Sequence, residues 1–188
     1  TRRSSDLVDT PTATSNDDTF LASDASGATA YALGGLDVID GGAGTDTLKV
    51  ADAATASTGN FSFNGATIKN VENIEVTTNG SFDVTANTGL SLKGYTGLTS
   101  ATLKAAGTDN SLVLASDTTN VNLTVAGSAT AGVTGGKAVS VTADTGLVTV
   151  AGDALTSVSI KGGASTSSVT NTVSGLGDTG TTLRSEER

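Results

Sequence analysis

The most constraining feature of the sequence is the nine-residue segment at residues 41–49, which fits the pattern G-G-x-G-x-D-x-U-x, where U is a large apolar residue. Its glycines permit a tight turn with positive φ, so that backbone carbonyl oxygens can point inward at an ion. Asp46 adds a carboxylate, which is a hard oxygen ligand suited to Ca²⁺. Leu48 then begins a short strand and directs its side chain into a core. Repeats of this type build parallel β-helices in which a cation closes each turn.

Two degenerate copies of the pattern precede this segment. The first, residues 32–40, keeps a glycine, an aspartate and an apolar residue in place, namely Gly35, Asp37 and Ile39. The second, residues 13–21, keeps Asp18 and has Asn16 where the pattern has a glycine. Asn is the next most tolerant residue for a left-handed backbone. The three copies therefore predict Ca²⁺ bound by the loops in residues 13–49.

The spacing of the copies suggests how the loops stack. Asp18 and Asp37 are nineteen residues apart. A helical turn made of two nonapeptides would place the loop of Asp18 near the loop of Asp37. The alternative for this part of the chain is a glycine-rich hairpin whose aspartates are solvated.

Composition limits the kind of core that the chain can build. Aromatic residues make up 3% of the 188 residues, and His, Cys, Met and Trp are absent. A core of this kind consists of thin layers of Val, Leu, Ile and Ala, which suits a solenoid better than a thick globular core. Because there are no cysteines, metal ions or stacking must stabilise the fold in place of disulfides.

The net charge excludes several classes of partner. At −9, with a pI near 4.2, the chain is a poor ligand for nucleic acid or for an anionic membrane surface. No hydrophobic run is long enough to span a bilayer, and no signal peptide is evident. The arginines all lie near the two ends of the chain, which suggests a fragment or a trimmed module of a longer protein.

From about residue 53 onward, the sequence changes to short segments in which apolar residues alternate with Ser, Thr, Asn or charged residues. Each segment is bounded by turn-forming residues, and most centres lie about eight to twelve residues apart, which indicates short β-strands. The segments lie at residues 61–63, 74–76, 82–84, 90–92, 112–114, 121–125, 139–141, 148–150 and 158–160. The residues expected to point inward in the later segments are Leu112, Leu114, Val121, Leu123, Val139, Val141, Val148 and Val150.

These strands favour a solenoid over a sandwich or a barrel. The inward residues are uniform in size, and hairpin-type pairs such as Asn79-Gly80 are few. The calcium repeats also commit the start of the chain to parallel coils. The predicted fold is all-β, with a β-sandwich as the alternative for residues 100–180.

Three segments together resemble a known family. They are residues 16–20 (NDDTF), residues 41–48 (GGAGTDTL) and residues 66–77 (ATIKNVENIEVT). The sequence resembles the RTX-containing bacterial surface-layer proteins of the Caulobacter type and related calcium-dependent adhesins. The resemblance covers residues 13–110 and is mainly compositional beyond them. It implies a right-handed parallel β-helix with RTX-like calcium-binding turns near the N-terminus, type I secretion and assembly into a surface lattice.

The resemblance also implies a set of calcium ligands. Side-chain ligand positions fall on Asn16, Asp18, Asp37 and Asp46. Loop positions that offer carbonyl groups, or let them point inward, fall on Gly34, Gly35, Gly41, Gly42 and Gly44.

An enzymatic function is not expected. Polysaccharide-cleaving β-helices need clustered carboxylates or basic residues beside aromatic rings. This chain has no His or Trp, and Glu72 and Glu75 at a spacing of three would face opposite sides of a strand. The abundance of Thr on the expected strand faces suggests a further, less favoured function, namely binding of ice or polysaccharide.

The expected function is therefore that of a structural calcium-binding module in a secreted, extracellular surface-layer protein on the bacterial cell surface, or of a stalk in a large RTX adhesin. Expected partners are copies of the same chain, and cell-surface polysaccharide through regions outside this chain, without nucleic-acid binding or membrane insertion. Four aspartates outside the repeat could bridge copies through calcium, or else simply form turns: Asp109, Asp117, Asp144 and Asp153. The expected organisation is residues 1–11 as a flexible lead-in, 12–52 as calcium-binding coils, 53–180 as a Thr/Ser/Ala/Gly-rich β-solenoid and 181–188 as a linker or tail.

Overall fold

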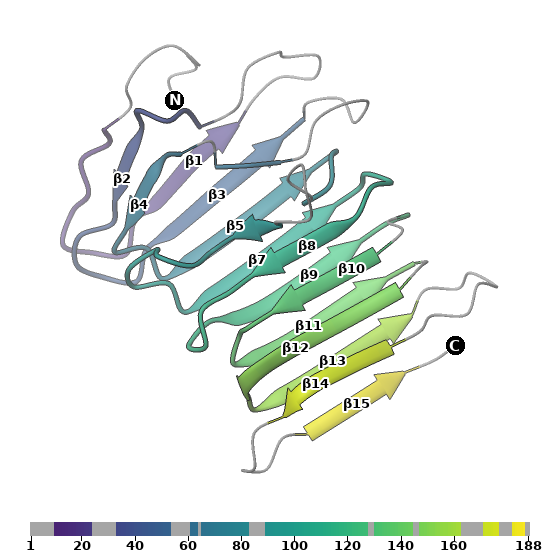
Figure 1. The fold of residues 1–188 in the computed structure, drawn as a ribbon. Helices are drawn as coiled ribbons and strands as arrows, with labels where there is room; N and C mark the ends of the chain where they lie inside the picture. The colour runs from purple at the N-terminus through teal and green to yellow at the C-terminus, as the bar shows by residue number, and fades with distance from the viewer. Residues whose placement is uncertain are drawn as a thin grey trace.

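The computed structural model describes residues 10–23, 33–53, 61–63, 65–82, 89–127, 130–144, 147–162, 171–176 and 182–186. These residues form fifteen β-strands and no helix (Figure 1). The all-β prediction is thereby confirmed. Most of the predicted lead-in at residues 1–11 lies outside the described residues, as does the predicted strand at 82–84 beyond Phe82.

The strands belong to three sheets. The long sheet contains β1 (Thr19–Ser23), β3 (Thr47–Asp52), β5 (Asn73–Thr78), β7 (Ser100–Ala105), β9 (Asn120–Val125), β11 (Ala138–Ala143), β13 (Ser157–Gly162) and β15 (Thr182–Glu186). The short sheet contains β6 (Leu90–Ser91), β8 (Ser111–Leu114), β10 (Thr130–Thr134), β12 (Leu147–Leu155) and β14 (Asn171–Leu176). A third sheet pairs β2 (Val38–Asp40) with β4 (Thr67–Lys69).

All the strand pairs in these sheets are parallel, and from β6 to β15 the chain alternates between the long and the short sheet. The strands stack from β1 at one end of the molecule to β15 at the other (Figure 1). This arrangement is consistent with the predicted parallel solenoid. It differs from the antiparallel pairing of a β-sandwich, which was the alternative for residues 100–180. The strand β15 lies within the segment 181–188 that was expected to be a linker or tail.

Two sizes of coil are present, a coil being the chain between neighbouring strands of the long sheet. Register partners along this sheet are Phe20, Leu48, Ile74, Ala101, Val121, Val139 and Val158. At the corner before each of these strands, a hydrogen bond joins one coil to the next. In the first three coils the two bonded residues are separated by 28, 26 and 27 positions in the sequence. The equivalent bonds after β7 link positions separated by only 21 and 19 residues. We call the coils from β1 to β7 the wide coils and those from β7 to β13 the narrow coils.

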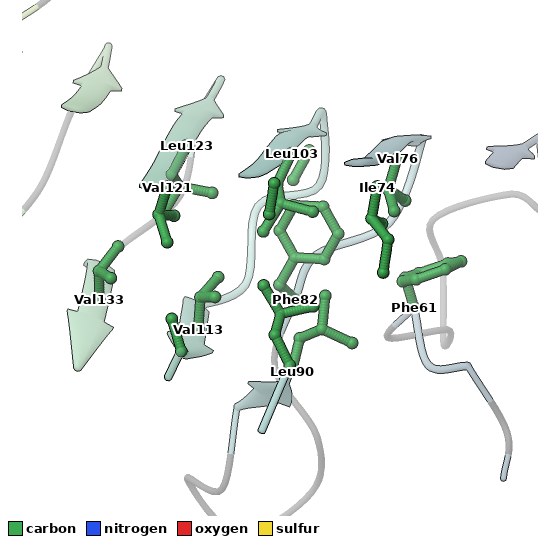
Figure 2. Packing of buried hydrophobic residues seen from close by; sticks show 14 of the residues in the cluster. Phe61, Ile74, Val76, Phe82, Leu90, Leu103, Val113, Val121, Leu123 and Val133 are labelled. Atoms are coloured by element: carbon green, nitrogen blue, oxygen red, sulfur yellow. The ribbon is translucent and has the colours of Figure 1, made fainter. Parts of the chain in front are cut away.

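The core consists of side chains stacked in register from coil to coil. Because alternate residues of a strand point to opposite faces, each coil contributes equivalent positions to the same inward row. One such row contains Val50, Val76, Leu103, Leu123, Val141 and Ile160, all of them buried. A facing row on the short sheet contains Leu90, Val113, Val133 and Val150. The side chains of the two rows pack against each other between the sheets (Figure 2).

Aromatic side chains fill the core of the wide coils. Phe61, Phe63 and Phe82 are buried there, and Phe82 lies between Leu103 of the long sheet and Leu90 of the short sheet (Figure 2). The Phe61 ring meets the rings of Phe63 and Phe82 edge-on, at centroid distances of 5.2 and 6.0 Å. Such contacts are favourable because the positive edge of one ring meets the negative face of the other.

Six of the eight predicted inward residues in the later strands are buried: Val121, Leu123, Val139, Val141, Val148 and Val150. The prediction is wrong for Leu112 and Leu114, which are only partly buried and lie on the outer face of β8. Val113 points inward instead, because its register partners are the buried Val133 and, beyond it, Val150. In Ser-Leu-Val-Leu both strand faces carry an apolar residue, so alternation alone could not choose between them.

A candidate cation site at the corner of the wide coils

Three acidic residues occupy the same position in successive wide coils. Asp18, Asp46 and Glu72 each immediately precede a strand of the long sheet, namely β1, β3 and β5. The backbone joins them, since the carbonyl of Asp18 accepts a hydrogen bond from Thr47 N–H and the carbonyl of Asp46 accepts one from Asn73 N–H. We call this set of three residues the acidic corner.

The stacking of the loops differs from the sequence prediction. Asp18 lies against Asp46, which is 28 residues later, and not against Asp37. The assumption of two nonapeptides per turn was therefore wrong. The wide coils are close to three nonapeptides long, because they also contain the third sheet, which a bridge between Lys69 and Thr96 extends.

Each acidic side chain of the corner binds the backbone of a neighbouring residue. Asp46 Oδ1 accepts a hydrogen bond from Asp18 N–H at 2.7 Å, and Glu72 Oε2 accepts one from Asp46 N–H at 2.7 Å. Asp18 Oδ2 accepts hydrogen bonds from N–H and Oγ1 of Thr14 at 2.6 and 2.9 Å. Hydrogen bonds to a carboxylate are stronger than those between neutral groups. The bonds that the Asp46 and Glu72 carboxylates accept therefore link each coil to the preceding one.

Asp46 is the unusual member of the corner. It is fully buried, and its second carboxylate oxygen, Oδ2, has no hydrogen-bond partner among the described residues. A carboxylate is rarely buried in this way because the loss of hydration is costly unless a cation or further donors compensate.

A backbone carbonyl lies close to this oxygen, beside Gly41. A Cβ placed on Gly41 would lie 2.6 Å from Asp46 Oδ2 and 1.8 Å from the carbonyl oxygen of Asn70. The two oxygens therefore lie close to each other, on the same side of the Gly41 Cα. Asn70 itself has a φ of 51°, in the left-handed region. A carboxylate and a carbonyl oxygen at one position are the donor types that bind Ca²⁺.

Six of the nine predicted ligand residues lie in the two loops that meet at this corner. The loop at residues 13–18 contributes Asn16 and Asp18, and the loop at residues 41–46 contributes Gly41, Gly42, Gly44 and Asp46. Gly42 and Gly44 have φ of 82° and 133°, as the tight turn requires. A Cβ on Gly44 would lie 2.6 Å from the Asn16 carbonyl oxygen, so the two loops touch there.

The other three predicted ligand residues form a separate turn. Gly34, Gly35 and Asp37 precede β2 of the third sheet, whereas Asp46 precedes β3 of the long sheet. Asp37 Oδ2 accepts a hydrogen bond from Gly34 N–H at 2.5 Å, and the Gly34 carbonyl accepts one from Asp37 N–H at 3.0 Å. The carboxylate of Asp37 thus closes its own turn, and the predicted set is divided between two parts of the coil.

Sequence reasoning missed Glu72, Asn70 and Asp40. Glu72 stands directly before the Asn-Ile-Glu-Val strand, the same offset that Asp46 has from β3, and this offset is the signal that could have identified it. Asp40 pairs with Lys69 at 2.9 Å and accepts a hydrogen bond from Asn70 Nδ2 at 2.8 Å. The Lys69 hydrogen bond, followed by that of Asn70, lowers the pKa of Asp40 below its ordinary value.

The described residues contain no group of three or more His, Cys, Asp or Glu side chains arranged to hold a metal ion. In the same part of the chain, no helix is long and apolar enough to cross a membrane. Comparison with protein-family models, characterised proteins and solved structures finds no match to this chain.

Proposed function

We propose that this chain is a structural, calcium-stabilised module of a secreted bacterial surface-layer protein. In this proposal the coils form a right-handed parallel β-helix, and Ca²⁺ binds the RTX-like turns at the acidic corner. The module is exported by type I secretion, lies on the cell surface and associates with copies of itself. It is not an enzyme.

One observation carries the calcium part of the proposal: the buried, unpartnered Asp46 Oδ2 beside the Asn70 carbonyl. A cation there would compensate the buried charge and join consecutive coils. An RTX-type site draws many of its ligands from backbone carbonyl groups, so it does not require three acidic side chains at one point. The glycines at 42 and 44 support such a loop because they take the positive φ that turns carbonyl groups inward.

Two features support a structural role. The stacked coils form an elongated body whose strands run across its long axis (Figure 1). The carboxylates of Asp109, Asp117, Asp144 and Asp153 are exposed, and a divalent ion could bridge such groups on two copies. A stalk within a large adhesin is the second candidate, because a stiff rod of stacked coils serves that role equally well.

Thermal unfolding with and without calcium tests the metal proposal. Calcium at about 100 times its Kd should stabilise the native protein by roughly 2.7 kcal/mol. The substitution Asp46→Asn should abolish most of this gain, because it removes the charge that the ion neutralises. In chelator, the same variant should be at least as stable as the native chain, because no charge is then buried without a partner.

The matched control is Glu75→Gln, which changes an exposed carboxylate on β5 outside the acidic corner. It should leave the calcium response unchanged and alter the stability little, because its ion pair with Lys49 is exposed. Hydrogen exchange adds a regional readout, since chelation should release the amides of residues 13–49 before those of residues 110–160. A melting curve unaffected by EDTA, or a full calcium response in Asp46→Asn, would reject the metal proposal.

Light scattering distinguishes the two structural roles. A surface-layer module should remain dispersed in chelator and form ordered sheets or fibres when millimolar calcium is added. If the protein stays monomeric at high concentration with calcium present, the adhesin stalk replaces the lattice proposal.

A further inference from the structure

The strand β1 forms the edge of the long sheet at the N-terminal end of the stack (Figure 1). Within the described part of the chain, it pairs only with β3 and only on one side. An edge strand presents backbone N–H and C=O groups to which another strand can add, and proteins often protect such edges with charged residues or proline. The segment Thr19–Ser23 contains neither. The opposite edge strand, β15, has Arg184 and Glu186 in its sequence. Of the two edges, β1 is therefore the less protected.

The pairing with β3 shows which backbone groups face this edge. The carbonyl of Asp18 accepts a hydrogen bond from Thr47 N–H, so the backbone groups of Asp18 point towards β3. In a strand, the N–H and C=O of one residue point to the same side, and the side alternates from one residue to the next. Thr19, Leu21 and Ser23 therefore direct their N–H and C=O groups away from β3, towards the outer edge of the sheet.

The side chains of β1 are less covered than those of the strands that follow it. Phe20 packs against the core but is only partly buried, whereas its register partners Leu48 and Ile74 are fully buried. On the outer face, Leu21 is 69% exposed, and it is one of three large apolar side chains exposed among the described residues. A strand added beside β1 would cover more of both Phe20 and Leu21. The apolar surface at this edge thus favours strand addition.

We propose that β1 pairs antiparallel with β1 of a second copy of this chain, about a two-fold axis at Leu21. Leu21 then lies opposite the partner's Leu21, Phe20 opposite the partner's Ala22, and Thr19 opposite the partner's Ser23. On the inner face a large side chain meets a small one, and on the outer face the two exposed leucines cover each other. The Leu21 pair and the two Thr19–Ser23 pairs each exchange two hydrogen bonds, because these residues face the edge. The strand is therefore complementary to itself.

The charge of the chain favours this arrangement over a head-to-tail contact. Asp18 precedes Leu21 by three residues, so the Asp18 residues of the two copies would lie six strand positions apart, roughly 20 Å. That separation exceeds the screening length of about 8 Å at physiological ionic strength. In a head-to-tail contact, Leu21 would instead meet Arg184, which has the equivalent register position on β15.

This inference rests on the self-association in the proposed function and assigns one contact surface to it. An interface with two-fold symmetry uses the same surface on both copies, so it closes on itself and gives a dimer. Ordered sheets or fibres would need a further contact between dimers, for which the calcium bridges proposed above are available.

Cross-linking tests the register of the pair. The chain has no cysteine, so Leu21→Cys introduces a single thiol. Residues opposite each other in a hydrogen-bonded antiparallel pair have Cα atoms about 5.5 Å apart, within the range of about 4.4–6.8 Å that a disulfide spans. On oxidation with copper phenanthroline in millimolar calcium, Leu21→Cys should form a covalent dimer on a non-reducing gel. The matched control is Ser23→Cys on the same face of β1. It should stay monomeric, because it would lie about 14 Å from its own copy.

A second variant tests the contribution of the leucine pair. Leu21→Lys should raise the Kd of the dimer about tenfold to hundredfold, because it replaces buried apolar surface with like charges opposite each other. Its control, Leu147→Lys, changes an exposed leucine on β12 of the short sheet and should leave the Kd unchanged. Sedimentation velocity measures both in calcium, at protein concentrations where no sheets form. Melting curves confirm that the variants fold, as expected for exposed positions.

Three results would overturn the inference. They are a native protein that sediments only as a monomer, cross-linking of Ser23→Cys as fast as that of Leu21→Cys, and equal Kd values for Leu21→Lys and Leu147→Lys. If calcium still produced sheets or fibres in any of these cases, the surface-layer proposal would stand and another surface would make its contacts. If Leu21→Cys cross-linked but calcium produced no sheets or fibres, the dimer would stand and the lattice proposal would fail.

Discussion

The wide and narrow coils stack in one continuous parallel sheet, yet they close their corners with different chemistry. In the first two wide coils, the carboxylates of Asp46 and Glu72 accept hydrogen bonds from backbone N–H groups of the neighbouring coil. In the third wide coil and in the narrow coils, Thr99, Thr119 and Thr156 at the same corner donate hydroxyl hydrogens to backbone carbonyl groups. The first arrangement buries negative charge and invites a cation, whereas the second is neutral and complete without one.

The cores differ in the same way. A wide coil has a longer contour than a narrow coil and encloses a larger cross-section, which Phe61, Phe63 and Phe82 fill. The described core of the narrow coils consists of Val, Leu, Ile and Ala. Coil length, core residue size and corner chemistry therefore change together near β7. This correlation indicates that a solenoid can change its cross-section without losing strand register.

The largest expected effect comes from emptying the wide core. Phe82→Ala should lower the free energy of unfolding by about 3–5 kcal/mol, because Phe82 is fully buried between the two sheets. The reciprocal change, Leu123→Phe, should cost about 1–3 kcal/mol by overpacking a narrow coil. Denaturant unfolding measures both. If Leu123→Phe were neutral, the narrow coils would have room for an aromatic ring, and the proposed link between coil length and residue size would be wrong.

A smaller effect should separate two glycines of the narrow coils. Gly127 and Gly135 have similar φ of 82° and 85°. A Cβ on Gly127 meets nothing within 4 Å, whereas one on Gly135 would lie 2.1 Å from the Ala115 carbonyl oxygen. Gly127→Ala should therefore cost roughly 1–2 kcal/mol from backbone strain alone. Gly135→Ala should cost about 1–3 kcal/mol more, because the coils must separate locally.

Chemical denaturation of the two glycine variants under the same conditions gives this difference directly. Equal losses of unfolding free energy would mean that the neighbouring coils can move apart at Gly135 at little energetic cost.

The smallest effect concerns pH and the wide coils. Burial raises the pKa of Tyr95 to about 12 from an ordinary value of 10.0, and its ring packs edge-on against Phe63 at 5.5 Å. The folded state thus favours the neutral phenol. The resulting stabilisation is complete below pH 10 and is lost as the pH rises towards 12. Tyr95→Phe has no phenol to ionise, so the native protein should lose stability relative to this variant over that interval.

Lysine titration affects both proteins equally in that measurement, which makes the phenylalanine variant the appropriate reference. A difference that stays constant from pH 9 to 12 would show that Tyr95 is solvated.

The features that repeat at short range could be predicted from the sequence. Alternation identified Val139, Val141, Val148 and Val150 as inward, because the residues between the members of each pair, Ser140 and Thr149, are polar. Pairing across coils was harder, since the partner of Asp18 depends on the length of the intervening chain. That length includes a third strand that the nonapeptide pattern does not reveal. Glu72 and Asn70 were missed for the same reason, because they meet the 41–46 loop only through stacking.

The parallel ladder described above also determines how the molecule responds to force. Its interstrand hydrogen bonds point along the stack, so a pull applied at the two ends loads them one coil after another and not all at once. The molecule should therefore unfold one coil at a time, and each unfolding step releases the length of one coil. At about 3.4 Å per extended residue, a narrow coil yields roughly 60–70 Å and a wide coil roughly 90–95 Å. A cation bound at the acidic corner would add a further link between the wide coils, which would then be the last to unfold.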